Sequence, residues 1–376
     1  MNVKHLILSV IVFGFPSMLM AQVGGQDIDT AQIIVPTKIV VDTTVTGEEN
    51  VIAAEGQEAQ LAYNSGIDLF NANMYKQAVS QFTTAIELNP DFAQAYMNRG
   101  SALFQMKALS QAIEDLQKAI EINDELPAAH YMLGLIYMQK QDYSNAQNAL
   151  DEAKTQKFQN PKLDYYLGVI AFMNEDYESA EFAFKDAIKE DKKNAMIYND
   201  LGSTYRKMEQ FDKAIAEYTK AIDLDKSTPM YYSNRGSVYR VQEKYEEAIN
   251  DYTKALDIDS EYKLAQNNRG VAKMHLEQYE AAIDDFDAVV SVDRDYAFAY
   301  NNLGLVYYRM QNYDDAITNY TKAIALDPDY GYAYLHRGNA KEMLRKFDDA
   351  CKDWEKALEL GVKNAESYLI YCNQED

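Results

Sequence analysis

A glycine that returns every 34 residues constrains this chain more than any other feature of its sequence. The period holds through nine consecutive glycines without an insertion, and an alanine stands twelve residues after each of them. A fixed period of roughly 20 to 50 residues indicates a repeat architecture rather than a series of unrelated globular domains. The glycines are Gly66, Gly100, Gly134, Gly168, Gly202, Gly236, Gly270, Gly304 and Gly338. The alanines are Ala78, Ala112, Ala146, Ala180, Ala214, Ala248, Ala282, Ala316 and Ala350.

Other positions of the repeat hold bulky and small residues at helical spacing. An aromatic residue or leucine stands sixteen residues after each glycine, as at Tyr252, and a small residue follows three positions later, as at Ala255. These offsets predict two helices per repeat, joined by a short turn and packed face to face. Glycine within a helix costs about 1 kcal/mol relative to alanine, and we expect the close approach of the second helix to require it. The sequence therefore predicts an all-α protein.

This pattern resembles the tetratricopeptide repeat. The residues that match that family within one unit and at the ends of two others are Leu201, Gly202, Tyr205, Ala214, Tyr218, Pro90 and Pro328. The tryptophan that opens a unit in the family is replaced by tyrosine or other residues. The resemblance covers residues 59–363 and implies a right-handed superhelical solenoid of nine helix–turn–helix units.

Three segments lie outside the repeats. Residues 1–21 have the lysine, the short apolar run and the small-residue end of a signal peptide. The mature chain is therefore expected to be exported, periplasmic or extracellular, and soluble without a transmembrane segment. Residues 22–58 are predicted to be an extended or disordered leader, which is either flexible or an arm that docks as a strand on this protein or on a partner. Residues 364–376 resemble one more first helix and are predicted to cap the solenoid.

The chain contains two cysteines, Cys351 in the ninth unit and Cys372 in the predicted cap. They are 21 residues apart on helices that we expect to be packed neighbours. In an exported protein this arrangement favours a disulfide that fixes the cap. The alternative is a pair of buried thiols that act as small apolar side chains.

The sequence contains few signs of catalysis. It has no HExxH, GxSxG, GxxxxGK or GxGxxG motif. His130, His275 and His336 lie in separate units, where solvent or groove positions are expected, so we predict no metal site and no cofactor. The net charge of −23 argues against nucleic acid as a partner. The acidity either keeps the protein soluble or attracts a basic partner.

The resemblance implies a concave groove lined by first helices, which in this family commonly holds an extended peptide or a partner helix. Positions three and two before each glycine, and four and five after it, are predicted to face inward. Along the chain they change from aromatic residues to amides with cations. An asparagine amide both donates to and accepts from a peptide backbone; its alternative role is helix packing within each unit. The predicted groove residues are Asn64, Asn98, Tyr131, Tyr165, Tyr166, Phe172, Asn199, Arg206, Lys207, Asn234, Arg240, Asn268, Asn302, Tyr308 and Arg309.

The basic residues near the glycines form two sets with different expected roles. Those directly before the glycine are expected to pack their stems between helices and to pair with neighbouring carboxylates. This first set is Arg99, Arg235, Arg269 and Arg337. The second set, Arg206, Lys207, Arg240 and Arg309, is predicted to face a ligand carboxylate. The carboxylate clamp of some tetratricopeptide proteins requires a lysine three residues before the glycine, which this chain lacks.

Three functions are compatible with these features. The first is a non-enzymatic scaffold that recruits a protein or peptide into its groove, as part of an envelope or secretion assembly. The second is a structural component that self-associates through the groove or the leader. The third is an enzyme or a small-ligand receptor, which would need a compact pocket with converging polar groups. The absence of catalytic motifs favours the first, and neither the partner nor the oligomeric state follows from the sequence.

Overall fold

The computed structural model of the chain describes residues 50–370 and residue 372. The predicted signal peptide and residues 22–49 lie outside the described residues, as do residues 371 and 373–376. The chain divides into two compact units, residues 1–192 and 193–376. All the secondary structure of the described residues is helical, and none of these helices has the length and apolarity needed to cross a bilayer.

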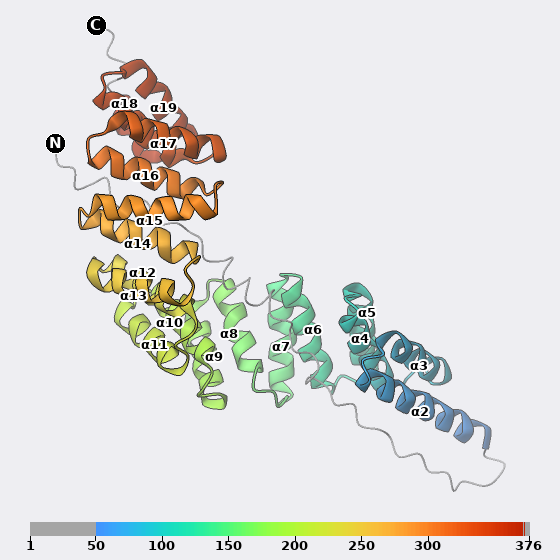
Figure 1. The fold of residues 1–376 in the computed structure, drawn as a ribbon. Helices are drawn as coiled ribbons and strands as arrows, with labels where there is room; N and C mark the ends of the chain where they lie inside the picture. Colours follow the sequence, from blue (N-terminus) through green and yellow to red (C-terminus); the bar gives the residue numbers. More distant parts are fainter. Residues whose placement is uncertain (1–49, 371, 373–376) are drawn as a thin grey trace. The chain divides into compact units, whose positions relative to one another are not determined.

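The first unit contains four helix pairs, which we number as repeats 1 to 4 in chain order (Figure 1). Within the unit each pair packs against the next, as in a solenoid. Its helices are α2 (Asn50–Asn71), α3 (Tyr75–Leu88), α4 (Ala93–Gln105), α5 (Leu109–Ile122), α6 (Pro127–Gln139), α7 (Tyr143–Thr155), α8 (Leu163–Met173) and α9 (Tyr177–Glu190).

The second unit contains repeats 5 to 9, which stack on one another in the same way. Its long helices are α10 (Ala195–Lys207), α11 (Phe211–Leu224), α12 (Pro229–Val241), α13 (Tyr245–Ile258), α14 (Lys263–His275), α15 (Tyr279–Val292), α16 (Ala297–Arg309), α17 (Tyr313–Leu326), α18 (Gly331–Met343) and α19 (Phe347–Glu359). The predicted all-α solenoid of tandem helix–turn–helix repeats is therefore confirmed.

The recurring glycines allow the close helix contact that the sequence predicts. In repeat 8, a Cβ atom placed on Gly304 would lie 2.5 Å from the ring of Tyr320, which belongs to the second helix of the same repeat. Tyr320 and Ala316 are completely buried at this contact. Any larger side chain at Gly304 would separate the two helices.

The N-terminal boundary of the helical region differs from the predicted one. Helix α2 begins at Asn50, so residues 50–58, which the sequence analysis assigned to the leader, are helical. This stretch contains Ala53, Ala54, Glu55 and Glu58, which are strong helix formers. Their helix propensity extends α2 towards the N-terminus, before the predicted start of the first repeat.

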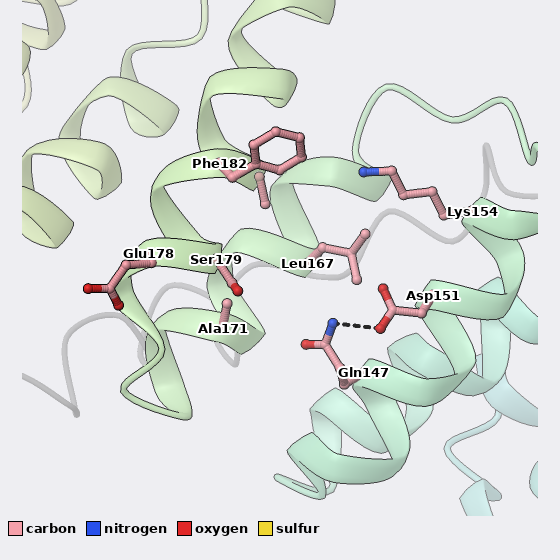
Figure 2. A pocket seen from close by; sticks show the side chains of 9 residues that line it. Gln147, Asp151, Lys154, Leu167, Ala171, Glu178, Ser179 and Phe182 are labelled. Atoms are coloured by element: carbon pink, nitrogen blue, oxygen red, sulfur yellow. Dashed lines mark hydrogen bonds between the residues drawn. The ribbon is translucent and has the colours of Figure 1, made fainter.

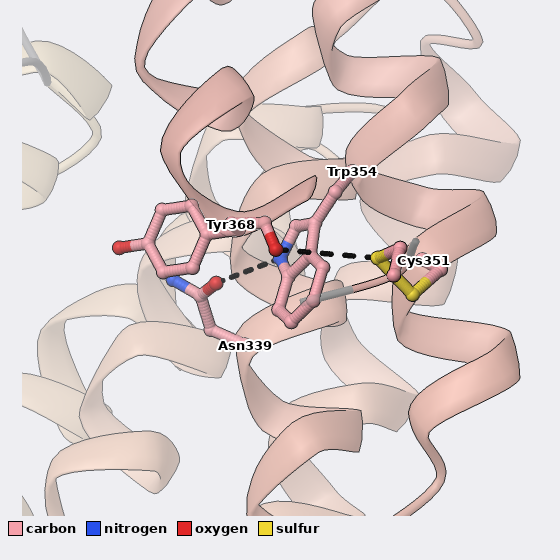
Figure 3. Close-up of a disulfide and its surroundings, with 5 residues drawn as sticks. Asn339, Cys351, Trp354 and Tyr368 are labelled. Atoms are coloured by element: carbon pink, nitrogen blue, oxygen red, sulfur yellow. Dashed lines mark hydrogen bonds between the residues drawn. A yellow bond between two sulfur atoms is a disulfide. The ribbon is translucent and has the colours of Figure 1, made fainter. Parts of the chain in front are cut away.

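The C-terminal segment contains less helix than the predicted cap. A 3-10 turn (η3, Lys363–Ala365) leads into the four-residue helix α20 (Glu366–Leu369). The ring of Tyr368 stacks on Trp354 at 5.2 Å between centroids, and Trp354 Nε1 donates to Asn339 Oδ1 at 2.9 Å (Figure 3). A disulfide joins Cys351 of α19 to Cys372, with the two Cα atoms 5.7 Å apart. The segment is thus tied to repeat 9 by one covalent bond and one aromatic contact.

Candidate functional site

Four of the nine repeats contain the same buried ion pair, and the first set of arginines forms it. In repeat 6, Arg235 donates through Nε and Nη2 to the carboxylate of Asp251, at 2.8 and 2.7 Å. Its Nη1 donates to Thr219 of the preceding repeat, at 2.9 Å. The equivalent groups are Arg99–Asp115–Thr83, Arg269–Asp285–Thr253 and Arg337–Asp353–Thr321. The predicted carboxylate pairing is confirmed, and these arginines join neighbouring repeats.

The predicted row of groove asparagines makes hydrogen bonds between repeats. The residue two before a glycine bonds to the residue three before the previous glycine, 35 positions earlier. These pairs are Asn98 to Tyr63 (2.8 Å), Asn234 to Asn199 (2.8 Å), Asn302 to Asn267 (2.9 Å) and His336 to Asn301 (3.0 Å). Each of these eight side chains is at least 96% buried. The amide NH2 groups of Asn98, Asn234 and Asn302 are therefore already used within the protein.

This arrangement changes what the asparagine row can offer a ligand. The Oδ1 atoms of Asn98 and Asn302 are buried and have no hydrogen-bond partner among the described residues, so these acceptors are unused but are not exposed to a ligand. Asn64 and Asn268 are only half-buried. A direct role of the row in peptide binding stays a prediction.

The predicted aromatic part of the groove is largely core in the first unit. Tyr131 is 1% exposed and Tyr166 is 8% exposed, and their ring centroids are 6.3 Å apart. Tyr165 and Phe172 are half-buried, and they pack against Phe184 and Tyr177 of α9 at 6.0 and 5.5 Å respectively. Large aromatic side chains at inward positions fill the space between first helices here, so little of Tyr131 and Tyr166 is left to contact a ligand.

The predicted ligand-binding cations lie at the C-terminal ends of first helices in the second unit. Arg206 and Lys207 end α10, Arg240 lies near the end of α12 and Arg309 ends α16, and all four are half-buried. Among the described residues, neither Arg240 nor Arg309 forms an ion pair with a carboxylate. The Nε atom of Arg240 is buried without a hydrogen bond. These two arginines differ in this respect from the four in the buried pairs.

Buried tyrosines and one histidine lie next to these cations. Burial raises the pKa of Tyr252, and the positive charge of Arg240 opposes that rise. The ring of His275 stacks on Tyr245 with 4.6 Å between centroids. Burial, followed by the charges of Arg240 and Arg309, lowers the pKa of His275 to about 4. Tyr245, Tyr252 and His275 thus lie in one positively charged region of the second unit. His275 is uncharged at neutral pH.

The histidines do not assemble into a metal site. The part of the chain that the structure describes has no group of three or more His, Cys, Asp or Glu side chains arranged to hold a metal ion. His336 is 3% exposed, so the expected solvent or groove position was wrong for this residue. It takes the place of an asparagine in the pairs between repeats.

A cavity of about 500 Å³ opens at repeat 4, between α7, α8 and α9 (Figure 2). The sequence analysis did not predict it. Its apolar lining is Leu167, Ala171, Phe182 and Ala183, and its polar lining is Gln147, Asp151, Lys154, Glu178 and Ser179. The sequence does carry a sign of it, because Leu167 and Ala183 stand where four other repeats have arginine and aspartate.

Comparison with protein families gave matches along most of the repeats. Models described as tetratricopeptide repeat match residues 229–262, 297–330, 131–195 and 183–216. A model described as TPR repeat matches residues 66–107, 100–141, 202–240 and 274–311. Together these matches cover residues 66–262 and 274–330, which is more than half of the chain.

Comparison with solved structures gave helical repeat proteins at low identity, and comparison with curated proteins gave no match. A tetratricopeptide repeat protein from Parabacteroides merdae is 19% identical, with a TM-score of 0.54 over 62% of this chain and 93% of that one. The Cut9–Hcn1 hetero-tetramer of the APC/C is 18% identical, with a TM-score of 0.50 over 78% and 60%. YrrB, described as a TPR protein with an unusual peptide-binding site, is 26% identical, with a TM-score of 0.46 over 49% and 95%. The first two likenesses show the fold alone.

Proposed function

The chain belongs to the tetratricopeptide repeat family, and on that premise we propose that it is a non-enzymatic scaffold that binds a partner protein or extended peptide. The proposed binding surface is the inward side of first helices in the second unit. It includes Arg206, Lys207, Arg240, Tyr308 and Arg309. The proposed location is outside the cytoplasm, which rests on the signal peptide predicted for residues 1–21.

One observation carries this proposal: two arginines lack carboxylate partners in a chain with a large excess of carboxylates. The sequence has 59 acidic and 36 basic residues. Arg235 and its three equivalents each have a buried aspartate, whereas Arg240 and Arg309 have no ion pair among the described residues. A half-buried guanidinium without a carboxylate partner is suited to a carboxylate of a ligand, because charge-assisted hydrogen bonds are the stronger ones.

The proposal can be tested by identifying the partner and then removing the two charges. The partner would be cross-linked in the native envelope, purified, and titrated by calorimetry against the wild-type chain and against R240Q/R309Q. We expect the affinity to fall at least about tenfold, since each lost charge-assisted bond is worth about 1.5 to 3 kcal/mol. Neither arginine has an ion pair to lose, so helicity should not change.

Lys254→Gln is the matched control. Lys254 is an exposed cation on a second helix, paired only with Asp257 at 3.5 Å, and its loss should leave the affinity unchanged. Equal binding by the wild type and R240Q/R309Q would refute the proposed surface. Light scattering tests self-association. A concentration-dependent oligomer, with no other protein captured, would favour a self-associating structural role over the proposed scaffold function.

A further inference from the structure

Repeat 4 lacks the ion pair that links four other repeats. The position directly before its glycine holds Leu167 instead of arginine, and the position fifteen after the glycine holds Ala183 instead of aspartate. The threonine supplied by the preceding repeat is replaced by Asp151. An acceptor from the neighbouring repeat is therefore retained in repeat 4, whereas the guanidinium that it would bond is missing.

A third replacement leaves the vacated space open. Three residues after the glycine, four repeats have a tyrosine and repeat 4 has Ala171. Repeat 3 also has leucine and alanine in place of the ion pair, at Leu133 and Ala149, but its Tyr137 is present and bonds to Gln117 at 3.3 Å. The tyrosines are Tyr137, Tyr205, Tyr239 and Tyr307. The cavity of about 500 Å³ thus lies where repeat 4 has lost three larger side chains.

The rim of this cavity is negatively charged and has an exposed aromatic ring. Asp151 accepts a hydrogen bond from Gln147 at 2.9 Å and makes no ion pair among the described residues (Figure 2). The one cation of the lining, Lys154, is already paired with Asp164 at 2.7 Å. Phe182 is 65% exposed, which is unusual for a phenylalanine.

We propose that this cavity receives an arginine side chain from a partner protein. Its methylene groups would lie against Leu167, Ala171 and Ala183, and its guanidinium would donate to the carboxylate of Asp151. The ring of Phe182 already has Lys154 Nζ 5.9 Å from its centroid, so Phe182 would contribute apolar contact with the methylene groups. The bound arginine would take the place that an internal arginine fills in repeats 2, 6, 7 and 9.

Arginine suits the site better than the other basic residue. The equivalent space in four repeats is shaped around a planar guanidinium with two or three directed donors, and lysine has neither that shape nor that donor pattern. The net charge of −23 also favours a basic partner over an acidic one at long range. This site lies in the first unit and is independent of the surface around Arg240.

The charge requirement is tested with two small probes, N-acetyl-arginine methylamide and its uncharged isostere N-acetyl-citrulline methylamide. Binding to the full chain would be followed by ligand-observed NMR. We expect a Kd in the millimolar range for the arginine probe, as is usual for a ligand of this size, and binding of the citrulline probe weaker by at least about tenfold. Asp151→Asn should weaken the arginine probe by a similar factor. Equal binding of the two probes would overturn the proposal.

The location is tested by filling the cavity with residues that the chain itself uses elsewhere. L167R/A183D rebuilds the internal pair of the other repeats, so its own arginine would occupy the site. This variant should fold and lose binding of the arginine probe. L133R/A149D in repeat 3 is the matched control: it installs the same pair beside Tyr137, as Arg235 and Tyr239 lie together in repeat 6, and it should keep the site in repeat 4. Undiminished probe binding by folded L167R/A183D would refute the assignment, whereas R240Q/R309Q should not affect this probe at all.

Discussion

His336 occupies the position that asparagine holds in five other repeats, and its bond to Asn301 is equivalent to the bonds of Asn98, Asn234 and Asn302. Burial lowers the pKa of His336 to about 4, whereas an unfolded histidine has a pKa of about 6.5. The unfolded state therefore binds a proton more readily than the folded state. The stability contributed by the neutral ring is complete above pH 6.5 and is lost as the pH falls from about 6.5 towards 4.

His336→Asn should remove this acid sensitivity and keep the hydrogen bond. At pH 7 we expect the variant and the wild type to have similar stability. At pH 5 the free energy of unfolding of the wild type should have fallen by about 2 kcal/mol more than that of the variant. The reason is that the pKa of His336 is about 4 in the folded state and about 6.5 in the unfolded state. Urea unfolding at the two pH values, followed by circular dichroism, measures both. Parallel losses in the two proteins would show that His336 does not carry this pH dependence.

The Arg235–Asp251 pair predicts a difference between single and double substitution. Asp251→Ala leaves Arg235, whose side chain is 18% exposed, without its carboxylate, and should cost about 3 kcal/mol. R235L/D251A introduces the residues found in repeats 3 and 4, removes both charges, and should cost less than the single change. Chemical unfolding of both variants gives the comparison. A double variant as unstable as Asp251→Ala would mean that packing, rather than the uncompensated charge, sets the cost.

At the scale of elements, the turn within each repeat has an unfavourable backbone conformation at one residue. Seven positions after each of the nine repeat glycines, a residue other than glycine has a φ angle between 58° and 61°. The left-handed region costs such residues about 1 kcal/mol or more. These residues are Asn73, Lys107, Gln141, Glu175, Glu209, Glu243, Glu277, Gln311 and Arg345.

Glu243→Gly should therefore stabilise the chain, by up to about 1 kcal/mol after the added flexibility of the unfolded state is subtracted. Glu247→Gly, at an exposed position in the first turn of α13, should instead destabilise it, because it lowers helix propensity and removes an acidic residue from the helix N-terminus. The two thermal midpoints should shift in opposite directions from the wild type. Shifts of the same sign would show that the turn has no strain for glycine to relieve.

The helix pairs could be predicted from the sequence because Gly236, Ala248 and Tyr252 recur at fixed distances and are all buried. The hydrogen bonds between Asn234 and Asn199 could not. They depend on how far one first helix lies from the next, and no spacing within a single repeat fixes that distance. The cavity was missed for a related reason: three replacements on two helices open it only together, and Leu167 or Ala171 alone looks like an ordinary core residue.

At the scale of the molecule, stability in such a chain is nearly one-dimensional, because within each unit the described helix pairs pack mainly against the adjacent pair. Unfolding of a terminal repeat therefore does not require the interior repeats to unfold. Among the described residues, repeat 9 packs against repeat 8 and against η3 and α20, which the Cys351–Cys372 disulfide ties to α19. A disulfide that closes a loop of this length is worth about 3 kcal/mol.

Removal of the disulfide should consequently act on the end of the chain rather than on all of it. In C351A/C372A, amide hydrogen exchange should accelerate in α18, α19 and α20, where Trp354 and Tyr368 lose a fixed partner. Protection in α12 and α13 should stay the same, because two intact repeats separate them from the change. Mass spectrometry of exchanged peptides measures both regions. A uniform loss of protection across the second unit would instead mean that repeats 5 to 9 unfold as one cooperative block, with the disulfide stabilising all of them.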